Sequence, residues 1–486
     1  MYLFTDDLTS RRNRSAIEAV SGVDGAKSDL EGRLERLERD LAKAKGRIAE
    51  LEAENRELRR QLEDERRKGK RQAGPFSKGS PKSDPKKPGR KPGRAYGSQF
   101  KRTTPSKIDR REVVACPLWC ERCGGRVQLD HREKQYQTDM PAVEPTTIEF
   151  TIDVGVCERC GRQVRGRHPE QTSNAAGHVG GVQIGPRAVA AATHLNKNCG
   201  MSWRRIATFF CDLFGLTVSA AGLCRAFQRV ANRGQPLYDD LRAQMHVEPV
   251  VSPDETSWRV NGEGAWLHTA AAPRMTLYSI ARGRGFEEAA HLIGEDYKGI
   301  LAVDGWAPYR RFPATIQTCL AHLLRRSHEL QNTPRPESSR LWLEAVSAAL
   351  KRALALRDRR TELSEHGFTI VHGRIEAELD RLLDEPPLED DTLRFAAHLV
   401  RERHELFVFL DYPHVPATNH RAEQAIRPAI VNRKMNGGNR TWRGASDQAV
   451  VASLLRTWQQ RGRNAIDQCV ALLTSPSLQA ALTLVR

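Results

Sequence analysis

A heptad repeat near the N-terminus constrains the fold of this chain more than any other sequence feature. Between residues 30 and 62, apolar residues recur at alternating spacings of four and three, and the remaining positions are almost all charged. Such a narrow stripe, sustained for more than four heptads, is typical of a coiled coil. Asn55 occupies one of the inward positions, where a single Asn usually selects a parallel dimer. We therefore predict a homodimer through this segment; a long amphipathic helix packed on its own chain is the alternative.

A basic stretch rich in Pro, Gly and Ser follows at residues 68–102. It contains 12 Lys or Arg and one Asp, and it carries most of the net charge of +17. This composition cannot form a packed core, so we expect a flexible linker that binds phosphates in a salt-sensitive manner. Lys87, Arg90 and Lys91 suit a short arm lying along a DNA minor groove. A solubilising tether explains the same residues equally well.

Charge and apolar content narrow the class of protein. With 39% hydrophobic and 28% charged residues, part of the chain should be extended while the rest can bury a core. The excess of positive charge favours nucleic acid as a partner. No apolar run is long enough to span a membrane, and the first residues do not form a secretory signal. We expect a cytoplasmic protein without a membrane partner, whose ten cysteines remain reduced.

Two matched cysteine pairs predict a zinc site. Cys120 and Cys123 form one Cys-x-x-Cys-Gly motif, and Cys157 and Cys160 form the second. Two thiolates separated by two residues can reach one tetrahedral zinc ion, and the following Gly permits the tight turn behind them. The intervening residues look strand-like, so we predict a zinc-ribbon-like module with four cysteine ligands and a structural role. Redox-active cysteines are the alternative, and Cys116 is a spare thiol that could replace one ligand.

Residues 186–245 have the apolar pattern of helices. Gly215 ends one predicted helix, and a Thr or Ser start signal precedes the next. Two helices joined by a short Gly-containing turn resemble the helix-turn-helix of DNA-binding proteins. A plain helical bundle fits the same pattern equally well.

From residue 247 onwards, short apolar runs replace the helical pattern. We predict three strands, a helix, a fourth strand and then a further strand or helix. Asp254 and Asp304 stand at the ends of two of the predicted strands. Carboxylates on neighbouring strands repel each other unless a divalent cation lies between them; for either Asp alone, a turn or cap role is the alternative. Residues 336–410 then have the pattern of long charged helices.

A lone acid, Glu423, lies among five cations between residues 418 and 440. Its neighbours include Arg427, Arg433 and Lys434. These cations suit the phosphates of DNA, Arg through a bidentate fork and Lys as a point charge. We predict that Glu423 completes a metal site beside them. An ion pair with Arg427 at i, i+4 is the alternative.

Several short motifs, taken in chain order, resemble transposases of the insertion-sequence-66 type. They are Asp-Glu-Thr at Asp254, "VDGWAPY" around Asp304, "CLAHLLRR" at 319–326, "NHRAEQAIRP" and "NRK" around Glu423, and "SLLRTWQQRGRN" at 453–464. The order of the predicted segments agrees as well. Trp306 and Pro308 depart from the usual second motif without replacing an acid.

The resemblance implies an RNase H-like fold with an Asp-Asp-Glu triad, formed here by Asp254, Asp304 and Glu423. It also implies two Mg²⁺ or Mn²⁺ ions and phosphoryl transfer, in which water cuts the element end and the freed 3′-OH attacks target DNA. The 119 residues between Asp304 and Glu423 then require a helical insertion, which a loop can tolerate.

Further expectations come from the same resemblance. His322, Arg325 and Arg326 resemble the family's fifth-strand motif and are expected near the phosphate or the flanking strand; a core or surface role is the alternative for His322. A location at the bacterial nucleoid and accessory proteins of the same element are also implied.

Together these features predict a multidomain α/β protein that acts as a metal-dependent DNA transposase. A non-catalytic zinc-binding, coiled-coil DNA-binding protein and a hydrolytic RNase H-like nuclease are the alternatives. The predicted segments are the arm and coiled coil (1–67), the basic linker (68–110), the zinc-binding domain (111–170), the helical region with its helix-turn-helix-like pair (171–245), the first part of the RNase H-like core (246–335), the helical insertion (336–410), and the catalytic Glu helix with the C-terminal helices (411–486).

Overall fold

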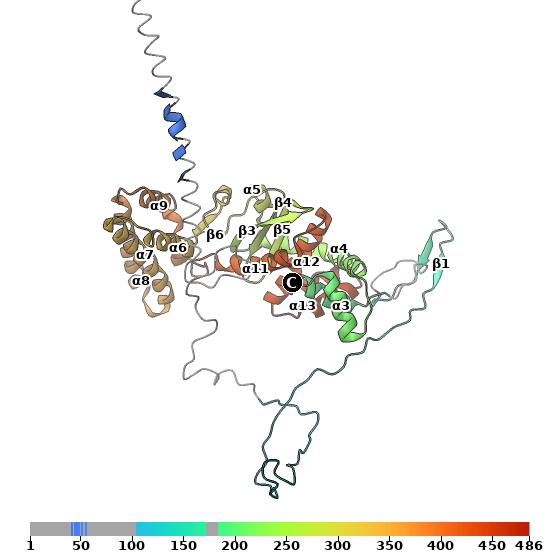
Figure 1. The fold of residues 1–486 in the computed structure, drawn as a ribbon. Helices are drawn as coiled ribbons and strands as arrows, with labels where there is room; N and C mark the ends of the chain where they lie inside the picture. Colours follow the sequence, from blue (N-terminus) through green and yellow to red (C-terminus); the bar gives the residue numbers. More distant parts are fainter. Residues whose placement is uncertain are drawn as a thin grey trace, which may run out of the picture. The chain divides into compact units, whose positions relative to one another are not determined.

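The computed structural model (Figure 1) describes residues 40–41, 43–48, 50–51, 54–55, 104–171 and 183–485. The chain divides into two compact units, Met1–Thr138 and Asp139–Arg486. In the first unit, the described residues between 40 and 55 are helical and exposed. Most of the predicted coiled coil, and the basic arm with Lys87, Arg90 and Lys91, lie outside the described residues.

A five-stranded mixed sheet forms the centre of the second unit. Its strand order is β5-β4-β3-β6-β7. β3, β4 and β5 pair antiparallel, whereas β6 runs parallel to β3 and β7 runs parallel to β6. The strands are β3 Val250–Val260, β4 Glu263–Ala271, β5 Thr276–Ala281, β6 Ile300–Val303 and β7 Thr315–Thr318.

β3 is longer than the sequence pattern predicts. Asp254, expected at the end of a strand, lies inside β3, which continues to Val260. The cause is a two-residue hairpin turn, because Asn261 and Gly262 both have positive φ, 53° and 81°, as a type I′ turn requires. Beyond Asp254, β4 pairs with β3 through to the turn and holds it extended.

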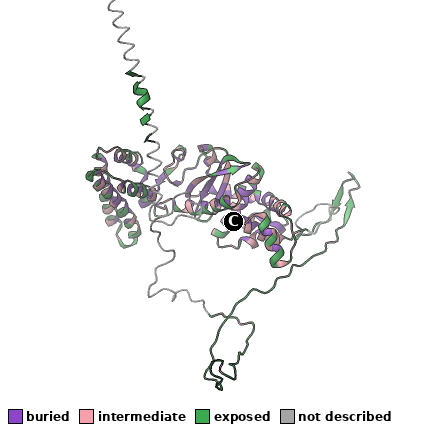
Figure 2. Ribbon diagram, in the orientation of Figure 1, coloured by how far each residue is buried: buried purple, intermediate pink, exposed green. Residues whose placement is uncertain are grey.

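Helices cover both faces of the sheet. α11 and α12 lie on one face and α5 lies on the other (Figure 1). Alternate strand residues divide between the two sides: Trp258 and Leu267 pack against α11 and α12, whereas Leu277 packs in the core that includes α5. Figure 2 shows this buried layer along the strands and the inward sides of the helices. These helices are α5 Phe286–Ile293, α11 His420–Asn436 and α12 Trp442–Gln460.

Residues 336–410 contain helices and no strand, and they separate β7 and α6 from α11 along the chain. Their core includes Leu343, Leu350 and Leu379, and it is continuous with Val250 and Ile300 of the sheet. The elements of this part are α7 Glu337–Asp358, η2 Arg360–Glu362, α8 Glu365–Asp384, α9 Asp390–Arg401, η3 Arg403–Glu405 and α10 Val408–Asp411; η1 Ala307–Arg311 and α6 Leu320–Gln331 precede it.

Within residues 183–249, three helices precede the sheet, and a C-terminal group packs against them. α4 contacts α12, and α2 contacts α13. These elements are α2 Pro186–Lys197, α3 Trp203–Phe214, α4 Ala220–Met245, α13 Ala465–Thr474, α14 Leu478–Leu482 and η4 Thr483–Val485. None of the helices in the described part of the chain is both long and apolar enough to cross a membrane.

The stretch between the two cysteine pairs has less regular structure than its sequence indicates. Only β1 Val154–Val156 is a strand there, paired with β2 Gln163–Arg165. The other residues between the pairs have almost entirely exposed side chains. They therefore gain little of the apolar burial that would hold further strands together.

Candidate active site

Asp254 and Asp304 lie at the same level on neighbouring strands. β3 and β6 pair in parallel with Val251 opposite Leu301, so each Asp follows its paired residue by three positions. Asp304 comes directly after β6, and its Oδ1 accepts a hydrogen bond from the backbone N–H of Trp306 at 3.2 Å. The register of the sheet thus brings together two acids that are 50 residues apart in sequence.

The first turn of α11 carries Glu423 to the same place. Ala271 of β4 packs against Ala422 and Ala425 of α11, and these small side chains let the helix approach the sheet closely. Asn419, which precedes α11, donates from its side chain to the carbonyl oxygen of Pro253 at 2.8 Å. The start of α11 is therefore fixed to the residue beside Asp254.

The charges of neighbouring acids act on Asp254. The pKa of Asp254 is raised to about 7, first by burial, then by the charges of Asp304 and Glu255, and also by that of Glu423. In the described part of the chain, no Lys or Arg nitrogen lies within 4.0 Å of Asp254, Asp304 or Glu423. Among the described residues these three acids thus have no Lys or Arg as a direct counter-ion.

The three acids lie near one another, but their side chains are not arranged to coordinate a metal ion as they stand. Among the described residues, no three His, Cys, Asp or Glu side chains are grouped tightly enough to hold a metal ion as they stand. Like charges with no cation between them are expected to stay apart. What the geometry provides is a meeting point of three acids from β3, β6 and α11.

The cations predicted to bind DNA lie further along α11 and on α6. Arg427, Lys434, Arg325 and Arg326 are exposed. Arg433 is anchored instead, since it donates to Oγ of Ser257 at 2.8 Å. A groove of about 530 Å³ opens beside this anchor, and Arg259, Trp266, Arg433 and Lys434 are among its lining residues. Its lining contains three cations and no acid, which suits an anionic partner.

Comparison with known proteins gives the family. Residues 181–447, more than half of the chain, match the family model described as "Transposase IS66 family". This chain belongs to the IS66 transposase family. A relative from Sinorhizobium fredii, named "Uncharacterized protein y4qI", is 26% identical over 225 residues. That alignment covers 42% of this chain and 40% of the relative, so it spans less than half of either protein.

Within this IS66-family chain, two adjacent acids of β3 have different surroundings. Side chains alternate along a strand, so Asp254 shares the α11 face with Trp258, while Glu255 points to the α5 side. There Glu255 is buried and accepts hydrogen bonds from Arg284 at 2.6 and 2.9 Å. Tyr309 donates to its other oxygen at 2.7 Å. Glu255 is therefore charge-balanced, and Asp254 is not.

Arg284 is held between two aromatic rings. Its guanidinium carbon lies 4.7 Å from the ring of Trp266 and 4.9 Å from the ring of Trp306. Sequence reasoning did not identify Glu255, Arg284 and Tyr309 as supports of the site. For Glu255 and Tyr309 the available signal was closeness to the acids, one residue after Asp254 and five residues after Asp304. Arg284 had no such signal.

His322 of the IS66 "CLAH" motif lies beside Glu423. Its Nε2 is 3.7 Å from Oε1 of Glu423, whereas no ion pair of 4.0 Å or less joins Glu423 to Arg427 in the described residues. The pKa of His322 is raised mainly by its interaction with the Cys319 thiol, with burial acting in the opposite direction. Cys319 also accepts a hydrogen bond from the backbone N–H of Asn419 at 3.1 Å. The motif thus connects the end of β7 to the start of α11.

A buried ion-pair network supports the loop after Asp304. Arg310 contacts Glu402 at 2.6 Å and Glu405 at 2.7 Å, and both carboxylates are almost completely buried. Arg310 also donates to the carbonyl oxygen of Gly305 at 3.2 Å. This network ties the helical insertion to the backbone next to the second acid, Asp304.

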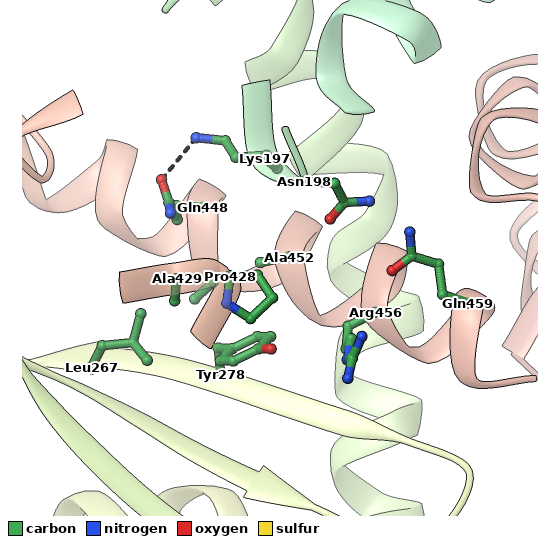
Figure 3. A pocket seen from close by; sticks show the side chains of 11 residues that line it. Lys197, Asn198, Leu267, Tyr278, Pro428, Ala429, Gln448, Ala452, Arg456 and Gln459 are labelled. Atoms are coloured by element: carbon green, nitrogen blue, oxygen red, sulfur yellow. Dashed lines mark hydrogen bonds between the residues drawn. The ribbon is translucent and has the colours of Figure 1, made fainter. Parts of the chain in front are cut away.

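A small cavity lies away from the acids. It has a volume of about 30 Å³ and is bounded by β4, β5, α11, α12 and the end of α2 (Figure 3). Lys197 donates to Gln448 there at 2.8 Å, and burial lowers the pKa of Lys197 to about 7. The cavity can hold water but not a nucleotide, so it belongs to the packing of the fold.

The two Cys-Glu-Arg-Cys segments fold into the same kind of turn, each within its own unit. Gly124 and Gly161 have φ of 69° and 68°, and their N–H groups donate to the carbonyl oxygens of Cys120 and Cys157 at 2.9 and 2.8 Å. Backbone N–H groups of the turn lower the pKa of each of these two thiols. Both turns therefore favour thiolate, the form that binds zinc.

Proposed function

We propose that this chain cuts DNA at the ends of its mobile element and joins the freed 3′-OH to target DNA. The observation that carries the proposal is the convergence of Asp254, Asp304 and Glu423, three acids from distant segments with no Lys or Arg to neutralise them among the described residues. The order of the sheet, with three antiparallel strands followed by two parallel ones, supports the RNase H-like assignment.

The donor set fits Mg²⁺ or Mn²⁺. Carboxylate oxygens are the ligands that these hard cations prefer, and a divalent charge removes the repulsion that raises the pKa of Asp254. The side-chain oxygen of Asn419 is buried without a hydrogen-bond partner and adds polar capacity beside the acids. We assign metal binding to Asp254, Asp304 and Glu423. When bound, the metal supplies Lewis acidity toward the phosphate.

The protein groups around the acids position the DNA. Arg433, fixed by Ser257, offers a preorganised guanidinium to a phosphate, while Arg427 and Lys434 add mobile charges on the same helix. Arg325 and Arg326 extend this positive surface on α6. His322 orients Glu423 from the side of α6.

The proposed chemistry consists of two displacements at phosphorus. In the first, a water oxygen forms a bond to the phosphorus at the element end, and the bond from phosphorus to the 3′ oxygen breaks. In the second, that 3′ oxygen bonds to a target phosphorus and displaces the target's own 3′ oxygen. Each step forms and breaks one P–O bond, and neither needs a covalent link to the protein.

The test uses the purified full-length chain, Mg²⁺ and DNA that carries the sequences flanking its gene. Wild type should give nicked ends with a 3′-OH and a joined product. Asp254→Asn, Asp304→Asn and Glu423→Gln should each lose at least about 100-fold of the rate, because each removes an electrostatic group from the site. Glu263→Gln, an exposed acid at the start of β4, is the matched control.

Three results would refute the proposal. Cleavage by Asp304→Asn at the wild-type rate removes the acids from the chemistry. Cleavage that never yields joined DNA leaves only the hydrolytic nuclease, and binding without any cleavage leaves only the DNA-binding protein.

We further propose that the two Cys-x-x-Cys turns bind structural zinc and that the heptad segment makes the protein a dimer. The matched backbone of the turns supports the first proposal. One zinc per chain is expected, with release of the metal in Cys120→Ser. Deletion of residues 30–62 should convert a dimer to a monomer in light scattering. Accessory proteins of the same element remain part of the proposed assembly.

A further inference from the structure

α2, α3 and α4 form a small helical unit with its own core. Ala192, Ile206, Phe210 and Leu223 are its fully buried members, and they come from all three helices. This unit lies within the matched family region but contains none of the proposed catalytic acids. Its function is therefore a separate question.

The connection between α3 and α4 is a tight turn. α3 ends at Gly215, whose φ of 65° is left-handed, a conformation that Gly adopts without strain. The N–H groups of Gly215 and Leu216 return to the carbonyl oxygens of Cys211 and Phe210 at 2.9 and 3.1 Å. Four residues later, Oγ of Ser219 accepts from the N–H of Gly222 and starts α4. Two helices joined this closely have the connection of a helix-turn-helix.

The C-terminal half of α4 is buried in the main core, and its N-terminal half has a row of exposed polar side chains. Its C-terminal residues Leu237, Leu241 and Met245 are completely buried in the main core, so the helix cannot move independently of the sheet. In the N-terminal half, Arg225 and Asn232 are exposed, and Gln228 between them is partly exposed. Spacings of three and four place these side chains on one side of the helix.

Positive charge predominates on these three helices. Residues 186–234 contain seven Lys or Arg and a single acid, Asp212. Arg204 and Arg205 at the start of α3 are exposed, and neither they nor Arg225 form an ion pair within the described residues. The charge of Arg225, after burial, also lowers the pKa of Arg229, as expected for two neighbouring guanidiniums without an acid between them.

We propose that α3 and α4 are a helix-turn-helix that binds the major groove of duplex DNA. Arg225, Gln228 and Asn232 along α4 face the base edges, and Arg204 and Arg205 contact phosphates. In this motif the second helix enters the groove while the first crosses the backbone. Arg pairs with guanine, and Gln or Asn pairs with adenine.

The surface fits a duplex better than a single strand. Binding of a single strand relies on exposed aromatic rings for base stacking. On these helices Trp203 packs on buried Phe227 at 5.5 Å, and the three Phe rings of α3 pack against one another. A rigid helix that presents polar side chains in one row matches a groove instead. The inference concerns recognition and holds whether or not the chain cuts DNA.

The experiment selects bound sequences from a random duplex library. The full-length chain carries Asp304→Asn, and no divalent metal is added, so binding is measured apart from cleavage. The selected duplex and a scrambled duplex are then compared by fluorescence anisotropy at several salt concentrations. A preferred sequence should emerge with wild-type recognition residues.

The variants separate base reading from charge. Arg225→Ala should weaken binding of the selected duplex by about 10- to 100-fold and relax the preference at one base pair. Arg225→Lys keeps the positive charge but loses the bidentate guanidinium. This variant should lose most of the preference for the selected sequence and keep its binding to the scrambled duplex. Arg204→Ala and Arg205→Ala should weaken both duplexes alike and reduce the salt slope by about 0.9 each. Arg374→Ala, an exposed cation on α8, is the control and should change neither.

Three outcomes would overturn the inference. They are a selected sequence that Arg225→Ala binds as tightly as the parent chain, an equal loss on both duplexes with Arg225→Ala, and a library from which no preference emerges. Failure of strand cutting in the earlier assay leaves this result unaffected, since the two measurements share no step.

Discussion

Loss of Arg310 should destabilise the fold more than loss of any exposed arginine. Its guanidinium is the only cation within 3 Å of Glu402 and Glu405 among the described residues. The side chains of the two carboxylates are 0% and 3% exposed. Arg310→Met keeps the length of the side chain and leaves both charges buried without that partner.

The magnitude follows from the burial of the two acids. Removing one partner of a buried ion pair costs about 3–5 kcal/mol, because the remaining charge has lost both water and its counter-ion. Arg310 retains some solvent contact, with 24% of its side chain exposed, so we expect the lower end, about 3 kcal/mol. For the unit Asp139–Arg486, this corresponds to a fall of roughly 4 °C in the melting temperature.

The assay is thermal and urea unfolding of the full-length chain at pH 7.5. Arg340→Met is the matched control, since 42% of the Arg340 side chain is exposed and its two ion pairs among the described residues lie within α7; its loss should change the stability much less than the loss of Arg310. Combining Arg310→Met with Glu402→Gln and Glu405→Gln should restore much of the stability, because no orphaned charge remains. Equal effects of Arg310→Met and Arg340→Met, or a triple variant as unstable as Arg310→Met, would refute the reasoning.

Three further predictions concern the acids and the end of α11. The pKa of Asp254 is about 7 in the folded chain against an ordinary 3.8, so the stability of the metal-free protein should fall as pH rises between these two values. Asp254→Asn should flatten this pH dependence in thermal melts. A slope that persists in the variant would contradict the prediction. Tyr309→Phe removes a 2.7 Å hydrogen bond to buried Glu255 and should cost about 1–3 kcal/mol in urea unfolding, whereas an unchanged midpoint would show that the bond contributes nothing. Gly438 and Gly462 both have positive φ, but a Cβ at Gly438 would meet a carbonyl oxygen of β3, whereas a Cβ at Gly462 would face open space. Gly438→Ala should therefore lower the melting temperature more than Gly462→Ala. Equal shifts would argue against this contact.

The sequence pattern predicts most helices and strands around the site. It fails where the pairing of two strands determines how long a strand is. The short apolar runs of β6 and β7 and the positions of Asp304 and Glu423 follow from local patterns. The length of β3 does not, because it depends on the pairing with β4. Asn261-Gly262 was the available signal, since this dipeptide between alternating residues indicates a type I′ hairpin.

The different surroundings of Asp254 and Glu255 could not be read from the sequence. Both are acids in one motif, and only the face of the sheet that α11 covers decides which stays unpaired. The counter-ion Arg284 is 29 residues away from Glu255, and no local rule selects it. The meeting of Glu423 with the two Asp residues likewise depends on α11 packing across an insertion, so it was inferred from the family resemblance rather than from spacing.

The chain leaves the sheet after β7 and returns to it before α11 at neighbouring backbone positions. The N–H of Leu320 donates to the carbonyl oxygen of Ala417 at 3.0 Å, and Asn419 bonds to Cys319 directly beside it. The two ends of this stretch are therefore joined to each other by hydrogen bonds. A replacement for the residues between them would have to supply its own partner for Arg310 and its own apolar contacts to Val250 and Ile300.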